Sequence, residues 1–323
     1  MKRILIEDFR EVEIPVPWGF ISGRWYGNQE VRPILAIHGW LDNLGTFDRL
    51  IPLLPDYIGM LCIDLPGHGR SSHLPPGINY GVYDLVYIIP TVVKHFGWNK
   101  VSLMGHSLGG IMSFAYTAMA PDTVDMVISL DILLPMRVEN GLAIEMFSNY
   151  QERLLVEDDR RKVAEKDRKP PSYTLAQMSK NVAEASLDAV TEDLAHHLLH
   201  RQVKKAHNHP DQNKFYYSRD GRVKYFNYWD IDTGLGGEMA RRIGNKPYLV
   251  LKGSLSLHLQ PRCDEIFSIL AKGNPHFEFY QVEGGTHHLH LQSAEECARY
   301  IVPFIQRHRP QKNQSYQEKG SKL

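Results

Sequence analysis

The sequence lacks the features that mark several specialised classes of protein. It has three cysteines, Cys62, Cys263 and Cys297, which are too few for a disulfide framework and have no zinc-binding spacing. Neither sign of charge is in excess, since 37 lysines and arginines balance 37 aspartates and glutamates. The formal net charge of zero gives no electrostatic reason to expect nucleic acid or an anionic membrane as a partner.

Long apolar runs are also absent. No stretch reaches the roughly 18 apolar residues that are typical of a membrane span. Two basic residues stand near the N-terminus, but Glu7 and Asp8 interrupt the apolar stretch that follows, so we expect no secretory signal. Hydrophobic residues make up 43% and charged residues 23% of the 323 positions, which is an ordinary globular composition. We therefore expect a soluble, intracellular protein with no membrane span.

Short apolar runs predict the strands of a sheet. Four runs without polar alternation lie at residues 33–37, 60–63, 101–104 and 126–130. Such runs are typical of strands buried on both faces of a parallel sheet. Stretches with helical spacing lie between them, such as residues 83–96 and 111–120. Residues 11–16 and 19–27 instead fit a hairpin-related pair at the sheet edge. The alternation predicts an α/β fold with a mostly parallel, doubly wound sheet.

The pattern changes in the middle of the chain. Residues 139–163 and 175–199 are charged and have helical spacing, and strand character returns only at 247–251 and 276–280. This interruption predicts four segments along the chain: a first part of an α/β core at 1–134, a mostly helical insertion at 135–237, a second part of the core at 238–308, and a flexible polar tail at 309–323.

The strongest chemical signal is Gly105-His106-Ser107-Leu108-Gly109, a G-x-S-x-G motif between a predicted buried strand and a predicted helix. In this setting the serine lies on a strained strand-to-helix turn, and the small residues on both sides allow the backbone to pass closely. The N-terminus of the following helix favours developing negative charge. Ser107 is therefore the candidate nucleophile.

A serine nucleophile needs a general base, because a free hydroxyl is almost wholly protonated at neutral pH. In strand–turn–helix hydrolases the order along the chain is serine, acid, histidine. The loop Gly284-Gly285-Thr286-His287 follows the last predicted strand, so its histidine can reach Ser107. We choose His287 as the base from 16 histidines, and we expect packing or solvent-exposed roles for His288 and His290.

Four motifs together resemble the α/β-hydrolase superfamily. They are Ile37-His38-Gly39-Trp40, Asp64-Leu65-Pro66-Gly67-His68-Gly69-Arg70-Ser71, Gly105-His106-Ser107-Leu108-Gly109-Gly110 and Gly284-Gly285-Thr286-His287. The chain is similar to the epoxide-hydrolase-like branch and, within it, to the serine hydrolase-like proteins related to kraken. The resemblance implies an α/β-hydrolase fold over nearly the whole chain, with the helical insertion as a cap.

The resemblance also implies roles for residues near the nucleophile. The backbone N–H groups of Trp40 and Leu108 would form the oxyanion hole, and losing one such donor typically costs ~10²–10³ in rate. His38 would hold its loop through hydrogen bonds, and residues 64–71 would form a structural turn.

The pattern leaves more than one candidate for the acid of the triad. Most relatives carry an aspartate a few residues after the strand that matches 248–251, where this chain has Gly253-Ser254-Leu255-Ser256. Some relatives take the acid from the end of the preceding strand, a position that matches Asp131. We predict Asp131 as the acid, with Glu283 and Asp264 as alternatives. Without a carboxylate to orient His287, the rate could fall by ~10⁴ and the enzyme would be weak or inactive.

Serine as the nucleophile excludes the reactions of epoxide hydrolases and dehalogenases, because attack at an sp³ carbon would leave an ether that the enzyme could not hydrolyse. Attack at a carbonyl through an acyl-enzyme remains. We therefore predict a serine hydrolase that acts on carboxylic esters, with a small-molecule acyl substrate and no metal or organic cofactor. The alternatives are a peroxisomal acyl-CoA thioesterase, a carbon–carbon bond hydrolase, and a weakly active or non-catalytic member that binds a small molecule.

The tripeptide Ser321-Lys322-Leu323 matches the peroxisomal address S-K-L. The polar residues before it would keep it exposed to the import receptor. We therefore predict a peroxisomal location, with the cytoplasm as the second choice.

Overall fold

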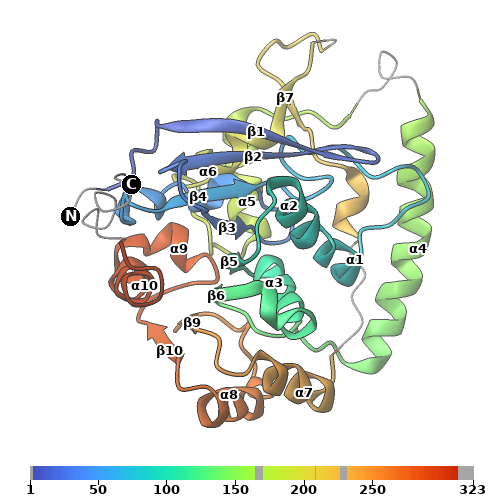
Figure 1. Ribbon diagram of the computed structural model, residues 1–323. Coiled ribbons are helices and arrows are strands. Elements are labelled where there is room, and N and C mark those ends of the chain that lie inside the picture. Colours follow the sequence, from blue (N-terminus) through green and yellow to red (C-terminus); the bar gives the residue numbers. More distant parts are fainter. Residues whose placement is uncertain (1–2, 164–169, 208, 226–230, 312–323) are drawn as a thin grey trace.

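The computed structural model describes residues 3–163, 170–207, 209–225 and 231–311. A single large sheet forms the centre of the molecule (Figure 1). Its strands are β1 (Phe9–Val16), β2 (Gly19–Gly27), β3 (Ile34–Ile37), β4 (Gly59–Ile63), β5 (Val101–His106), β6 (Val124–Leu130), β9 (Tyr248–Gly253) and β10 (Phe277–Val282).

The strand order is β1-β2-β4-β3-β5-β6-β9-β10. The hairpin β1–β2 joins β4 in antiparallel pairing, and every other pair is parallel. Both features agree with the sequence: the alternating segments form the edge hairpin, and the unbroken apolar runs form the parallel centre. The predicted α/β fold with a mostly parallel, doubly wound sheet is confirmed.

Helices cover both faces of the sheet because successive side chains of a strand point to opposite sides. In β3, Leu35 and Ile37 pack into one apolar cluster, whereas Ile34 and Ala36 pack into the other. The first cluster is completed by α1 (Val82–Val86), α2 (Ile88–Phe96), α3 (Leu108–Met119), α7 (Thr233–Ile243) and α8 (Cys263–Gly273). The second is completed by the short helices η1 (Leu44–Phe47), η2 (Ile51–Leu53) and α9 (Leu289–Gln292), and by α10 (Ala294–His308).

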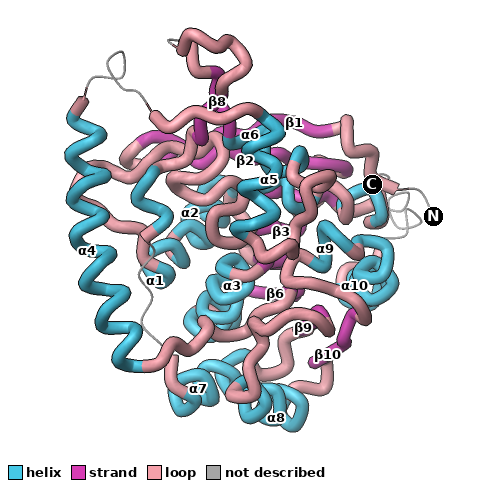
Figure 2. The backbone as a smooth tube through the Cα atoms, turned by 180° about the vertical axis from the view of Figure 1, so that it is seen from behind, coloured by secondary structure: helices cyan, strands magenta, loops and turns pink. Residues whose placement is uncertain are grey.

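The segment between β6 and β9, here called the insertion, is mostly helical, as the sequence predicts. It contains α4 (Asn140–Lys162), α5 (Leu175–Ala185), α6 (His196–Gln202), the small sheet of β7 (Val203–Lys205) and β8 (Phe215–Tyr217), and the 3₁₀ helix η5 (Gly221–Lys224). Helix α4 runs along one side of the molecule in both views (Figures 1 and 2). Helix α7 spans the predicted limit at residue 237 and packs against α3 and α8 of the core.

A buried ion pair fastens the insertion to the core. The Arg201 guanidinium on α6 donates from Nε and Nη2 to Oδ2 of Asp64 at 3.0 and 2.9 Å, and from Nη2 to Ser22 Oγ at 3.0 Å. Both charged side chains are fully buried. Because Asp64 directly follows β4, α6 is held against the carboxyl end of that strand.

Two predicted helices are interrupted. The helix expected over 83–96 divides at Tyr87 into α1 and α2, because Pro90 has no N–H to donate to the carbonyl of Val86. The helix expected over 175–199 stops at Ala185, and Leu187 and Asp188 then adopt positive φ angles of 51° and 58°. Neither residue is glycine, so the sequence carries no ordinary signal for this left-handed turn.

The first residue of the predicted tail, Arg309, is hydrogen-bonded to the core. Arg309 donates from Nη2 to the backbone oxygen of Arg32 at 2.7 Å, which fastens the end of α10 beside β3. The tripeptide Ser321-Lys322-Leu323 lies outside the described residues, so the peroxisomal location stays a prediction. None of the described helices is both long and apolar enough to cross a membrane.

Candidate active site

The register of the parallel strands brings the predicted site residues to one edge of the sheet. His106 at the end of β5 pairs with Leu130 at the end of β6, and Leu130 pairs with Leu251 of β9. The residues that follow these ends are joined too: the Ser107 N–H donates to the Leu130 oxygen at 3.2 Å, and the Asp131 N–H donates to the Leu251 oxygen at 2.7 Å. Ser107 and Asp131 therefore leave the sheet side by side.

Ser107 forms a strained turn between β5 and α3. Its φ and ψ angles are 49° and −116°, a conformation that L-residues rarely adopt and that is stored at functional sites. The loop after β3 passes directly over this turn, since a Cβ on Gly39 would lie 3.1 Å from the Ser107 Cβ. Only glycine at position 39 allows this approach, which places the next residue, Trp40, beside the nucleophile.

His287 and Asp131 form a hydrogen-bonded pair. His287 Nδ1 lies 2.7 Å from Asp131 Oδ2, and because a carboxylate oxygen accepts, Nδ1 carries the proton. This tautomer leaves the lone pair of Nε2 available for a proton from a hydroxyl. Within the described residues, neither the Ser107 hydroxyl nor Nε2 of His287 has a hydrogen-bond partner, which is common for catalytic groups before substrate binds.

Asp131 is held by three donors. Its Oδ1 accepts the Gly253 N–H at 2.8 Å, and its Oδ2 accepts the Ser256 hydroxyl in addition to His287. The backbone turns at Asp131 with a positive φ of 59°, which points the carboxylate along the sheet edge. Burial raises the pKa of Asp131 to about 7, against the opposing effect of the donors from Ser256 and Gly253.

The loop that carries His287 is fixed against the end of β9. A Cβ on Gly253 would lie 2.5 Å from the carbonyl oxygens of Gly285 and Thr286, so glycine is needed for this close approach. His106 Nε2 lies 3.0 Å from the backbone oxygen of His287. The pKa of His287 is lowered well below its usual value, first by burial and then by the surrounding histidines. His287 is therefore neutral near pH 7, as a general base must be.

The other two candidate acids lie away from this pair. Glu283 is exposed, and its Oε1 accepts the Ser254 hydroxyl at 3.3 Å. Asp264 is exposed in the first turn of α8. Among the three carboxylates weighed from the sequence, only Asp131 contacts His287.

The two predicted oxyanion residues lie on the two segments that meet at Ser107. Leu108 is the first residue of α3, and its N–H makes no hydrogen bond within the described part of the chain. Trp40 lies in a turn in which the Asp42 N–H donates to the Gly39 oxygen at 3.3 Å. The Trp40 indole Nε1 donates to the Val223 oxygen of the insertion at 2.6 Å.

Two buried histidines, His38 and His68, make hydrogen bonds that hold the loop after β3, here called the Trp40 loop. His38 Nδ1 donates to the Gly39 oxygen at 2.7 Å, and His38 Nε2 accepts the Leu65 N–H at 2.9 Å. His68 Nε2 accepts the Leu41 N–H at 3.3 Å. Burial lowers the pKa of both rings, to about 3 for His68. His38 thus holds its loop through hydrogen bonds, as expected from the sequence, and His68 in the turn at 64–71 adds a further contact.

Sequence reasoning missed His258. Its ring is stacked on that of His287, and its Nδ1 lies 3.3 Å from the Ser256 hydroxyl oxygen. Ser256 lies in the segment where the resemblance to α/β-hydrolases predicts the usual acid, and its hydroxyl donates to Asp131. The one signal available was the polar run Ser254-Leu255-Ser256-Leu257-His258 after β9, which has no spacing specific to catalysis.

Two groups of side chains could each hold a metal ion. One consists of Asp131, His258 and His287, and the other of Asp42, His106 and His288. The three ligand atoms of each group lie within 4.8 Å of one another.

His290, which was expected to have a packing or solvent-exposed role, is buried and has its Nε2 2.8 Å from Thr46 Oγ1.

Comparison with known proteins agrees with this architecture. A family described as the alpha/beta hydrolase fold matches residues 32–293. A probable serine hydrolase from Drosophila melanogaster is 34% identical over 314 residues, covering 94% of this chain and 90% of that protein. The chain belongs to the alpha/beta hydrolase fold family.

Within the family the chain resembles serine hydrolase-like proteins. One from Danio rerio is 31% identical over 312 residues and covers 94% of this chain and 91% of its own length. Among solved structures, a hypothetical protein from Pseudomonas aeruginosa has a TM-score of 0.74 at 24% identity, covering 91% of this chain and 99% of that one. A thioesterase domain from the curacin biosynthetic pathway has a TM-score of 0.72 at 20% identity, covering 92% and 100%. These two structures show a shared fold.

Proposed function

We propose that the protein is a serine hydrolase of carboxylic esters that works through an acyl-enzyme formed on Ser107. The observation that carries the proposal is the 2.7 Å hydrogen bond between His287 Nδ1 and the buried Asp131 carboxylate, at the same sheet edge as the strained Ser107 turn. A buried carboxylate that orients a neutral imidazole near a serine on such a turn is the arrangement that acyl transfer requires.

In the proposed reaction, Ser107 Oγ attacks the ester carbonyl carbon while its proton moves to Nε2 of His287. The carbonyl electron pair moves to oxygen, where the N–H groups of Trp40 and Leu108 stabilise it. Collapse of this intermediate breaks the bond to the alcohol oxygen, which takes the proton from His287. Water then repeats the sequence on the acyl-enzyme, releasing the acid and restoring Ser107. Throughout, Asp131 holds the imidazole and stabilises its protonated form.

The insertion is proposed as a cap over this site. The insertion contacts two loops of the proposed site. The Trp40 indole donates to the Val223 oxygen, and the Thr286 hydroxyl donates to the Ala189 oxygen at 3.1 Å. A segment fastened to both the Trp40 loop and the His287 loop is placed to bound the acyl pocket. The sequence of the insertion carries a group of aromatic residues at 216–229, which could form an apolar pocket wall or the insertion's own core. Part of this group lies outside the described residues, and Tyr217 packs with the insertion's own small core.

One observation favours acyl-CoA thioesters as a second candidate substrate class. A cavity of about 440 Å³ in the insertion is lined by Arg160, Arg219 and Lys224, with Glu157 as its acidic side chain. The buried Nε of Arg219 has no hydrogen-bond partner within the described residues. Basic side chains of this kind suit phosphate groups. An esterase and a thioesterase differ in kcat/KM for an oxyester and a CoA thioester of equal acyl chain length.

The first test is labelling with a fluorophosphonate probe, which reacts with activated serines. We expect the wild-type chain to be labelled and Ser107→Ala to remain unlabelled. If both proteins are labelled equally, Ser107 is not the nucleophile. If folded wild-type protein is not labelled, the proposal of an active hydrolase fails, and a non-catalytic role in binding a small molecule becomes the better account.

A further inference from the structure

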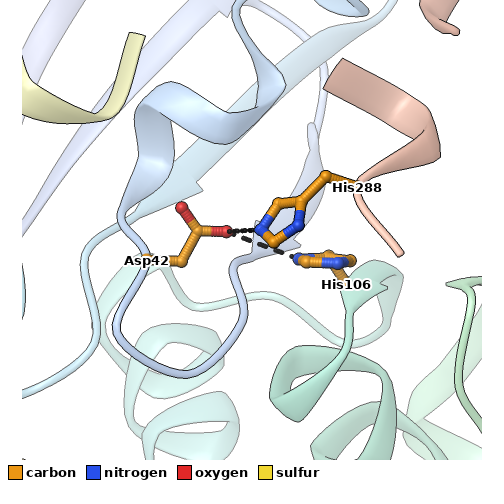
Figure 3. Close-up of side chains that lie close together, drawn as sticks. All are labelled: Asp42, His106 and His288. Atoms are coloured by element: carbon orange, nitrogen blue, oxygen red, sulfur yellow. Dashed lines mark ion pairs between the residues drawn. The ribbon is translucent and has the colours of Figure 1, made fainter. Parts of the chain in front are cut away.

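A second cluster of titratable side chains lies directly behind the proposed nucleophile and base. Asp42 lies in the loop after β3, His106 is the last residue of β5, and His288 lies in the loop after β10. Their side chains converge (Figure 3). Asp42 Oδ2 lies 3.4 Å from His106 Nδ1 and 3.6 Å from His288 Nε2. Asp42 and His106 are almost fully buried, with exposed fractions of 2% and 1%.

The tautomer of His106 leaves its contact with Asp42 without a donor. His106 Nε2 faces the backbone oxygen of His287 at 3.0 Å, and because a carbonyl oxygen only accepts, Nε2 carries the proton. In the neutral ring, Nδ1 then presents a lone pair to the Asp42 carboxylate.

The two facing atoms have no hydrogen-bond partners. Neither Asp42 Oδ2 nor His106 Nδ1 makes a hydrogen bond within the described residues, although both are buried. The Asp42 carboxylate is oriented by its other oxygen, Oδ1, which accepts the Asn43 N–H at 2.9 Å. Two lone-pair donors that face each other in a buried site repel, unless a cation lies between them.

The distances distinguish a metal ion from a proton. Hydrogen bonds join nitrogen and oxygen at about 2.7–3.2 Å. A tetrahedral ion with ligand bonds of about 2.0–2.2 Å instead sets neighbouring ligand atoms roughly 3.3–3.6 Å apart. The values of 3.4 and 3.6 Å at Asp42 fit the second case. The other group fits the first case, since a proton joins His287 Nδ1 and Asp131 Oδ2 at 2.7 Å.

We propose that Asp42 Oδ2, His106 Nδ1 and His288 Nε2 bind a divalent transition-metal ion, with zinc as the ion that suits two imidazoles and one carboxylate. The His106 Nε2–H bond to a backbone carbonyl is the usual support of a histidine ligand. In His288, the proton of the ligating tautomer lies on Nδ1, which is buried and makes no hydrogen bond within the described residues. Three protein ligands leave the fourth tetrahedral position to water.

Such an ion would join the three segments that form the proposed active site: the loop after β3, the end of β5 and the loop after β10. His106 directly precedes Ser107, His288 directly follows His287, and Asp42 lies two residues after Trp40. The role of the ion is therefore structural, because it fixes the spacing of these three segments without contacting substrate.

The test uses the full chain, expressed with added zinc and purified without a metal-chelating resin. We expect about one zinc ion per chain by mass spectrometry, and a lower melting temperature after treatment with a chelator. Asp42→Asn and His288→Gln should each reduce the metal content to background. The matched control is His258→Asn, which alters the other cluster and should keep the ion.

Wild-type protein gives an independent readout if the variants fold poorly. After zinc is replaced by cobalt, the intense visible absorption of a four-coordinate site is expected. The proposal is overturned if wild-type protein remains free of metal after dialysis against zinc or cobalt. It is also overturned if His258→Asn loses the ion while Asp42→Asn retains it, which would assign the ion to Asp131, His258 and His287.

Discussion

The imidazole ring of His258 lies parallel to that of His287, with ring centroids 3.4 Å apart and an angle of 8° between their planes. His258 therefore covers one face of the proposed base and restricts rotation of its ring. The Ser256 hydroxyl connects this stack to the acid, since it donates to Asp131 and accepts the His258 N–H at 3.2 Å. The orientation of His287 thus depends on a stack as well as on a carboxylate.

Removing the stacked ring should slow the reaction without weakening substrate binding. We expect His258→Ala to lower kcat roughly ten- to a hundredfold, with KM little changed, because His287 gains freedom to leave its reactive orientation. His258→Phe keeps a flat ring in the stack and should retain most of the wild-type kcat. Steady-state kinetics on a chromogenic ester decide the matter. Equal losses in both variants would contradict a role through stacking.

Asp131 should be essential for turnover, and the two alternative acids should not. Asp131→Asn leaves the size of the side chain unchanged but favours the wrong tautomer of His287, so we expect kcat to fall by ~10⁴. Glu283→Gln and Asp264→Asn serve as controls and should keep wild-type rates. Unchanged turnover in Asp131→Asn would refute the assignment of the acid.

The raised pKa of Asp131 predicts the acid limb of the pH profile. The working pair has an ionised Asp131 and a neutral His287, so uptake of one proton removes activity. Because burial raises the pKa of Asp131 to about 7, kcat/KM should fall as the pH drops through about 7. The limb belongs to the pair, since the two groups titrate together.

The Ser256→Ala variant tests the origin of this limb. The Ser256 hydroxyl donates to the ionised carboxylate and lowers its pKa, so removing the hydroxyl should move the limb to higher pH. The measurement is kcat/KM from pH 5 to 9 for both proteins. A shift toward lower pH in Ser256→Ala would show that the limb has another origin.

Breaking the buried ion pair between Arg201 and Asp64 should destabilise the protein strongly. Arg201→Met leaves a buried, unpaired carboxylate, and we expect the free energy of unfolding to fall by about 3–5 kcal/mol. The matched control is Lys180→Met, because Lys180 pairs with Glu184 on an exposed helix face. This substitution should change the free energy of unfolding by about 0.5 kcal/mol or less. Chemical denaturation measures both. Similar small losses in the two variants would contradict the prediction.

Much of the fold could be predicted because its strands have simple patterns. The runs at 33–37 and 60–63 are apolar at every position since both faces of β3 and β4 are covered, and this pattern alone indicates a parallel centre. The left-handed turn at Leu187 could not be predicted, because it depends on how α5 meets the core and has no glycine to mark it.

The candidate site was only partly accessible to sequence reasoning. Ser107 lies in a motif with a mechanical cause, whereas the choice among Asp131, Glu283 and Asp264 depended on which carboxylate the fold brings to His287. The stack of His258 and the convergence of Asp42, His106 and His288 join residues that are far apart in the chain. No local spacing reports such contacts, since they follow from the strand order.

That strand order also has a consequence for folding. Strand β6 pairs with β9, so Val127 meets Tyr248 only after the whole insertion has been synthesised. Until then, the apolar edge of β6 has no neighbour on that side. Pairing between segments so distant in sequence is slow, and exposed strand edges favour aggregation in the meantime. Because β9 is synthesised late, the nascent chain is prone to aggregate at β6, the strand that Asp131 directly follows.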